Sequence, residues 1–145
     1  MGKFNFTLEK LLDFRRENED SLKQEYTTLG SELSLKERKI NELLSEKKSL
    51  MYSIEPTVGR MQIQRNYLDE INQQVNRLRL ESLELQKGLA ELLERLVGAQ
   101  QERKVLEKLE TKQKDEFDLR LAHEEQKELD EFANRRILKG GENYG

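Results

Sequence analysis

The sequence predicts an all-α protein: a long antiparallel two-helix coiled-coil hairpin with a C-terminal helical overhang. Apolar residues recur at alternating steps of three and four along most of the 145-residue chain, which is the heptad pattern of helices that supercoil around a partner. The one proline, Pro56, divides this pattern into two matching stretches. Charged residues make up 38% of the chain and apolar residues 34%, a composition that suits a narrow seam flanked by charge. Sustained heptads also argue against disorder, the competing interpretation of so polar a chain.

Residues 1–55 are expected to form the N-terminal coiled-coil helix. Thr7 suits the N-cap position, and Glu9 and Asp13 follow it near the positive end of the helix dipole. The heptad pattern then runs unbroken to Ile54. Its apolar seam residues are Leu8, Leu12, Leu22, Tyr26, Leu29, Leu33, Ile40, Leu43, Leu50 and Ile54.

Residues 56–60 are expected to form the turn. Pro56 disfavours the helical conformation at Glu55 and cannot sit inside a regular helix, so the chain reverses there. Thr57 and Gly59 add turn and capping chemistry.

Residues 61–138 are expected to form the second coiled-coil helix. Gly30, Gly88 and Gly98 fall inside the two helices but off the seam, and each costs about 1 kcal/mol relative to alanine. The seam residues of the second helix are Met61, Leu68, Ile71, Val75, Leu78, Leu85, Leu89, Leu92, Leu96, Ala99 and Leu106.

The second helix is longer than the first, so residues 111–138 form an overhang without a partner in the sequence. An unpaired helix with apolar side chains favours binding to another protein. The apolar residues of the overhang are Phe117, Leu119, Leu121, Leu129, Phe132 and Ile137. Residues 139–145 are expected to be a flexible tail.

The two helices are expected to pair with each other in a register that opposes residues whose numbers add to 111. This register sets Leu43 against Leu68, and it places the polar seam residues Lys47 and Gln64 in one layer. A short turn gives the partner helix a millimolar effective concentration, which favours the intramolecular hairpin. A parallel homodimer is the alternative arrangement.

Several apolar residues lie off the seam. Those at outward heptad positions are expected to bind partners, because exposed apolar clusters usually mark a contact. They are Phe14, Leu35, Leu80, Leu83, Val97 and Val105. Those beside the seam are expected mainly to widen it, and they are Leu11, Leu44, Met51, Tyr67 and Leu93.

Composition and motifs argue against several other functions. Acidic and basic residues are mixed along the chain, without the basic stripe that nucleic-acid binding needs. No apolar run approaches the roughly 20 residues of a transmembrane helix, so we expect no membrane insertion. Cysteine is absent, His123 is the one histidine, and a two-helix fold offers no cleft in which carboxylates could act as acid and base. We therefore expect no enzyme activity, catalytic residue, cofactor or metal, and a cytoplasmic protein.

Three segments carry a family resemblance. Residues 4–15 (FNFTLEKLLDFR), 103–109 (RKVLEKL) and 125–136 (EQKELDEFANRR) resemble the FliJ family of the bacterial flagellar type III export apparatus. The chain length, the position of the turn and the absence of cysteine also fit this family. The resemblance implies a hairpin similar to the γ stalk of rotary ATP synthases.

The resemblance also implies partners. FliJ-like proteins bind the hexameric export ATPase, contact the cytoplasmic part of the export gate at the inner membrane, and bind escort chaperones of export substrates. Carried over by position to the paired ends of the hairpin, the ATPase contact falls on Leu11, Phe14, Arg15, Gln126, Asp130, Glu131 and Arg136. Nearer the turn, the export-gate contact falls on Ile40, Leu44, Tyr67, Ile71 and Gln74. Ile40 and Ile71 are also seam residues, which conflicts with a partner contact.

Three alternative functions remain open from the sequence. The equivalent stalk of a virulence type III secretion system would share these physical features. A prefoldin-like holdase is disfavoured, because the residues around Pro56 are too few for the β-hairpins of that family. A generic scaffold coiled coil is the third alternative.

Overall fold

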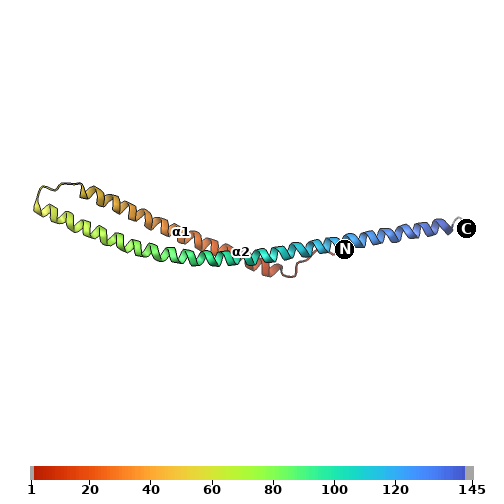
Figure 1. The fold of residues 1–145 in the computed structure, drawn as a ribbon. Coiled ribbons are helices and arrows are strands. Elements are labelled where there is room, and N and C mark those ends of the chain that lie inside the picture. The colour runs from red at the N-terminus through yellow and green to blue at the C-terminus, as the bar shows by residue number, and fades with distance from the viewer. Residues whose placement is uncertain (1, 143–145) are drawn as a thin grey trace. The chain divides into compact units, whose positions relative to one another are not determined.

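The computed structural model describes residues 2–142 and contains two helices in that range. Helix α1 spans Glu9–Met51 and helix α2 spans Val58–Glu142 (Figure 1). No strand occurs in the described residues, so the predicted all-α hairpin is confirmed. Of the tail expected at 139–145, residues 143–145 lie outside the described range, whereas α2 continues beyond Leu138 to Glu142.

The chain divides into two compact units. The hairpin unit is Glu17–Gln100, and it contains the turn and the two helical arms that lead into it. The terminal unit combines Met1–Arg16 with Gln101–Gly145.

In the hairpin unit, α1 and α2 lie side by side and antiparallel (Figure 1). Leu43, Ile71 and Val75 are almost fully buried and form the core, against which the half-buried Ile40 and Leu78 pack. The heptad pattern predicted the apolar residues of this seam and the polar residues Lys47 and Gln64, and every member of the observed seam is at least half-buried. The members are Glu19, Leu22, Tyr26, Leu29, Leu33, Lys36, Ile40, Leu43, Lys47 and Leu50 on α1, and Gln64, Leu68, Ile71, Val75, Leu78, Ser82, Leu85, Leu89, Leu92, Leu96 and Ala99 on α2.

The register differs from the expected one by about one heptad. Lys36 forms an ion pair with Glu81 at 2.6 Å, and these two numbers add to 117 rather than 111. Leu43 shares its core cluster with Val75, and Leu68, its expected partner, is not part of that cluster. A shift of one whole heptad keeps every seam position on the seam, so the burial pattern is preserved.

The connection between the helices explains the shift. Residues 52–57 are non-helical, and Figure 1 shows that α2 begins farther out than α1 ends. The Gln64 side-chain amide donates hydrogen bonds to the carbonyl oxygens of Leu50 and Ser53, so Gln64 lies level with the end of α1 and the first residues of α2 lie beyond it, beside the connection. Ile54 and Met61 are consequently exposed (93% and 51%), although the heptad pattern placed them on the seam.

Thr57 caps the N-terminus of α2, as expected. Its Oγ1 accepts a hydrogen bond from the backbone N–H of Arg60 at 3.2 Å, and its carbonyl oxygen accepts one from the N–H of Met61 at 2.9 Å. The first bond satisfies one of the N–H groups that a helix leaves unpaired at its start.

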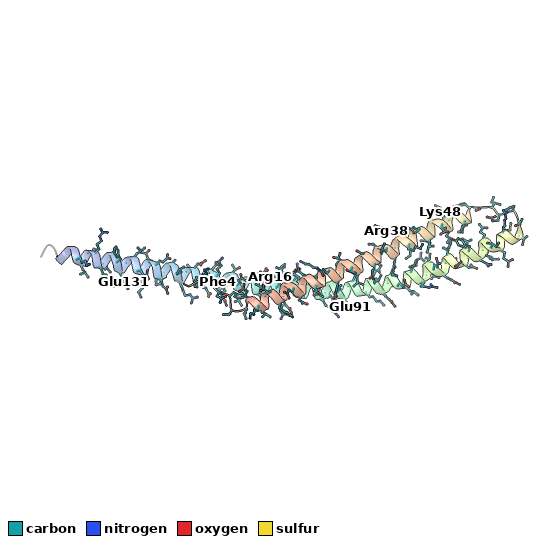
Figure 2. The ribbon with its side chains drawn as sticks, turned by 180° about the vertical axis from the view of Figure 1, so that it is seen from behind. Phe4, Arg16, Arg38, Lys48, Glu91 and Glu131 are labelled. Atoms are coloured by element: carbon teal, nitrogen blue, oxygen red, sulfur yellow. The ribbon has the colours of Figure 1, made fainter. Side chains whose placement is uncertain are left out.

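In the terminal unit, the residues before α1 cover part of α2. Phe6 is buried, and the ring of Phe4 lies 5.7 Å from the ring of Phe117, centroid to centroid. Figure 2 labels Phe4 beside α2. The expectation that residues 111–138 have no partner within the chain is therefore wrong at Phe117. A non-helical segment supplies that partner, and heptad analysis detects only helical ones.

The rest of the overhang is uncovered. Every residue from 122 to 139 is exposed, and Figure 2 shows Glu131 on a part of α2 with no second segment beside it. No helical stretch in residues 2–142 combines the length and the apolar content that crossing a membrane requires.

Candidate interaction surfaces

The outward apolar residues are exposed, as the heptad positions predicted. Their exposed fractions run from 43% at Val97 to 65% at Leu80 and Val105. Among the residues beside the seam, only Leu44 is half-buried, and it packs against the hairpin core. The remaining four flanking residues are exposed to solvent: Leu11, Met51, Tyr67 and Leu93.

The first group of expected ATPase contacts lies in the first two turns of α1. Leu11 and Phe14 are exposed, at 38% and 59%. The guanidinium of Arg15 pairs with Glu102 at 2.6 Å, and its central carbon lies 6.0 Å from the centroid of the Phe14 ring. The Arg15 charge is thus held against α2, whereas the two apolar side chains are open to a partner.

The second group lies near the end of α2. The side-chain amide of Gln126 donates a hydrogen bond to Oδ1 of Asp130 at 3.1 Å, and Glu131 is exposed. Arg136 is exposed beside the apolar side chain of Phe132, and both border a shallow hollow. The other residues of this hollow are Arg135, Leu138 and Lys139.

The structure does not bring these two groups together. Arg15 lies against Glu102, and Gln126 follows Glu102 by 24 residues of continuous helix, which is about 36 Å at 1.5 Å per residue. The expected ATPase contact therefore consists of two separate surfaces of the terminal unit. They separate because α1 begins only at Glu9, whereas α2 continues far past the position of its pairing with Arg15.

The expected export-gate residues differ in accessibility. Ile71 is 2% exposed inside the hairpin core, and Ile40 packs against the same core, so neither presents a surface to a partner. Tyr67 and Gln74 are exposed. The Tyr67 hydroxyl donates a hydrogen bond to the Glu46 carboxylate, and this bond raises the pKa of the Tyr67 phenol.

Sequence reasoning missed one surface, at the turn of the hairpin unit. The heptad pattern assigned Ile54 and Met61 to the seam, but both are exposed, together with the neighbouring Tyr52 and Val58. Pro56 was the available signal, because residues beside a break in the heptads lack an opposing helix.

Potential metal ligands do not gather in the described part of the chain, since no three His, Cys, Asp or Glu residues there could hold an ion. The exposed apolar side chains of α1 and α2 are instead suited to contact with other macromolecules.

Comparisons with known proteins place the chain in a family. The family model described as "Flagellar FliJ protein" matches residues 4–142. Neither the search of curated proteins nor the search of solved structures found a match. With nearly its whole length matched and its two helices forming a hairpin, the chain belongs to the FliJ family of coiled-coil proteins associated with flagellar export.

Proposed function

We propose that this chain is a non-enzymatic, cytoplasmic coiled-coil stalk of the flagellar export apparatus. It binds the hexameric export ATPase through its terminal unit and contacts the cytoplasmic part of the export gate through its hairpin unit. Family membership supports the association with export. The assignment of each partner to a surface rests on the exposed side chains described above.

The uncovered end of α2 is the observation that carries the ATPase contact. Residues 122–139 are all exposed, yet they include Leu129, Phe132 and Ile137, each more than 60% exposed. An exposed helix with such side chains gains stability when a partner removes them from water, at about 25 cal/mol per Å² of apolar surface. Basic and acidic side chains alternate with them, which suits a polar rim around an apolar contact.

Phe14 and Leu11 provide a second ATPase contact on α1. Both are apolar and exposed, and the neighbouring Arg15 is fixed by Glu102. Their neighbour Arg15 pairs with α2 at Glu102, which is 24 residues before Gln126. The two groups therefore contact separate places on the ATPase.

The gate contact uses Tyr67, Gln74 and the accessible side of Leu44. Ile40 and Ile71 support this surface from inside the core. The outward residues Leu80 and Leu83 remain for escort chaperones, since both are exposed and apolar.

The test compares two variants on α1. Phe14 and Leu35 occupy the same outward heptad position and have similar exposure, 59% and 63%. We expect Phe14→Glu to weaken association with the purified hexameric ATPase by about tenfold or more, as a central interface residue would, whereas Leu35→Glu leaves it unchanged. Size-exclusion chromatography and surface plasmon resonance measure the association, and circular dichroism checks that both variants keep their helix content.

Arg136→Glu should also weaken the association, because it reverses a charge on the uncovered end of α2. Equal effects of Phe14→Glu and Leu35→Glu would contradict the assignment of this surface. Lack of any association between the unaltered chain and the ATPase would contradict the proposed function itself.

A further inference from the structure

Exposed apolar side chains gather at the turn of the hairpin unit. Ile54 and Val58 are 93% and 80% exposed, the highest values among the large apolar residues of the described chain. Surfaces of this kind usually mark a contact. The exposed apolar residues of this tip are Met51, Tyr52, Ile54, Val58, Met61 and Ile63.

The tip is positively charged in an otherwise acidic chain. Residues 46–65 contain four basic and two acidic residues, a local net charge of +2, whereas the whole chain carries −3. Lys48, Arg60 and Arg65 are exposed, and none of them belongs to an ion pair among the described residues. Figure 2 labels Lys48 near the turn. An anionic partner therefore fits this surface.

The apolar side chains surround the tip instead of forming one face. Met51, Tyr52 and Ile54 precede Pro56, and Val58, Met61 and Ile63 follow it on α2. At about 100° per helical residue, Val58 and Ile63 point in directions about 140° apart. A groove on a protein would contact only one of these sides, whereas a bilayer interface surrounds a protruding tip. A second copy of the chain would bring two positively charged tips together, which is unfavourable.

We propose that the tip of the hairpin unit docks on the surface of an anionic lipid bilayer. The apolar side chains enter the interfacial region, and Lys48, Arg60 and Arg65 contact lipid phosphates, the combination that gives peripheral proteins their affinity. The contact is peripheral and uses no residue assigned to the ATPase.

A single tryptophan tests the insertion of the tip, because the chain contains none. The emission of Ile54→Trp should shift to shorter wavelength on addition of phosphatidylcholine vesicles that contain phosphatidylglycerol. Vesicles of phosphatidylcholine alone should leave it unchanged. Leu80→Trp is the matched control, since Leu80 is an exposed apolar residue of the same unit away from the turn, and its emission should not respond to either vesicle.

Vesicle sedimentation of the full chain tests the affinity. The double variant Tyr52→Ser, Ile54→Ser should lose about tenfold or more in binding to the anionic vesicles, and Arg60→Gln about fivefold. The control Leu80→Ser, Leu83→Ser should bind as the unaltered chain does. The tip variants should keep their ATPase association, so that failure of the lipid contact is distinguishable from failure of the stalk function.

The proposal is overturned if the chain does not sediment with anionic vesicles, or if the tip and control variants bind them equally. It is also overturned if the unaltered chain does not bind the vesicles and the tip variants bind the purified cytoplasmic domain of the gate more weakly than the unaltered chain does. The tip would then be a binding site for a protein.

Discussion

In the hairpin unit, α2 is accompanied by a second helix. In the terminal unit, its partners are the first two turns of α1 and the short non-helical segment before them, and the residues from 122 to 139 are all exposed. Leu43, Ile71 and Val75 are buried in the first case. In the second, similar side chains such as Leu129 and Ile137 stay in water. The same type of helix is therefore stabilised internally in one unit and left to be stabilised by a partner in the other.

This difference separates folding from binding. Helices gain most of their stability from packing of an apolar face, so the hairpin unit provides the cooperative core of the protein. Side-chain hydrogen bonds between residues one turn apart support the remainder of α2, for example that of Gln126 to Asp130, but such exposed pairs contribute only about 0.2–0.5 kcal/mol each.

Cross-linking is expected to give the largest effect, because a given pair of cysteines forms a disulfide in one register and not in the other. The chain has no cysteine, so introduced pairs are unambiguous. In the observed register, Leu33→Cys should form a disulfide with Leu85→Cys and not with Leu78→Cys. The two registers differ by one heptad, which is about 10 Å along the helix. A disulfide needs Cα atoms within about 7 Å, so only one of the two pairs can form it. Non-reducing electrophoresis measures the bond, and formation with Leu78→Cys alone would reinstate the register expected from sequence.

Ile71→Ala and Leu129→Ala compare a covered with an uncovered side chain directly. Ile71 is 2% exposed and Leu129 63%. We expect Ile71→Ala to lower the free energy of unfolding by about 2–5 kcal/mol through the cavity it leaves, whereas Leu129→Ala changes it by less than about 0.5 kcal/mol. Urea unfolding followed by circular dichroism measures both, and similar losses would mean that the end of α2 is packed in solution.

The fold was predictable because the seam is periodic, but the register was not. Moving α2 by one heptad leaves each seam residue on the seam, so apolar periodicity cannot distinguish the two pairings. Matching the polar layer of Lys47 and Gln64 selected the wrong pairing. In the structure the polar seam residue Lys36 is satisfied by Glu81, which a comparison of seam positions alone does not consider.

Exposure at the candidate site was predictable where heptad position alone decides it. Phe14 and Leu35 are exposed for this reason. Residues outside regular helix follow no heptad, so the burial of Phe6 and the exposure of Ile54 required the structure. Ile71 shows a different limit, since the family resemblance suggested a gate contact for a side chain that the seam already occupies.

The aromatic pair Phe4 and Phe117 sharpens the comparison within the terminal unit. With ring centroids 5.7 Å apart, a double-mutant cycle to alanine should give a coupling energy of about 0.5–1.5 kcal/mol. The same cycle between Phe4 and Phe132, which is exposed, is the control and should give no coupling.

Hydrogen exchange read at residues 113–121 should accelerate in Phe4→Ala, since these amides lose their cover. Unchanged exchange would show that the N-terminal segment does not protect α2 in solution.

The smallest expected effect comes from exchanging glycine and alanine, which differ in helix propensity, in each of the two units. A Cβ added at Gly88 meets no atom within 4 Å, so Gly88→Ala should stabilise the hairpin unit by about 0.5–1 kcal/mol and raise the midpoint of thermal unfolding. Ala122→Gly makes the reverse change in the uncovered part of α2. Because that part is not held by a second helix, the substitution should lower the helix content seen by circular dichroism without moving the cooperative midpoint. If Ala122→Gly moved the midpoint as far as Gly88→Ala does, the uncovered end would belong to the same cooperative core, and the contrast between the two units would fail.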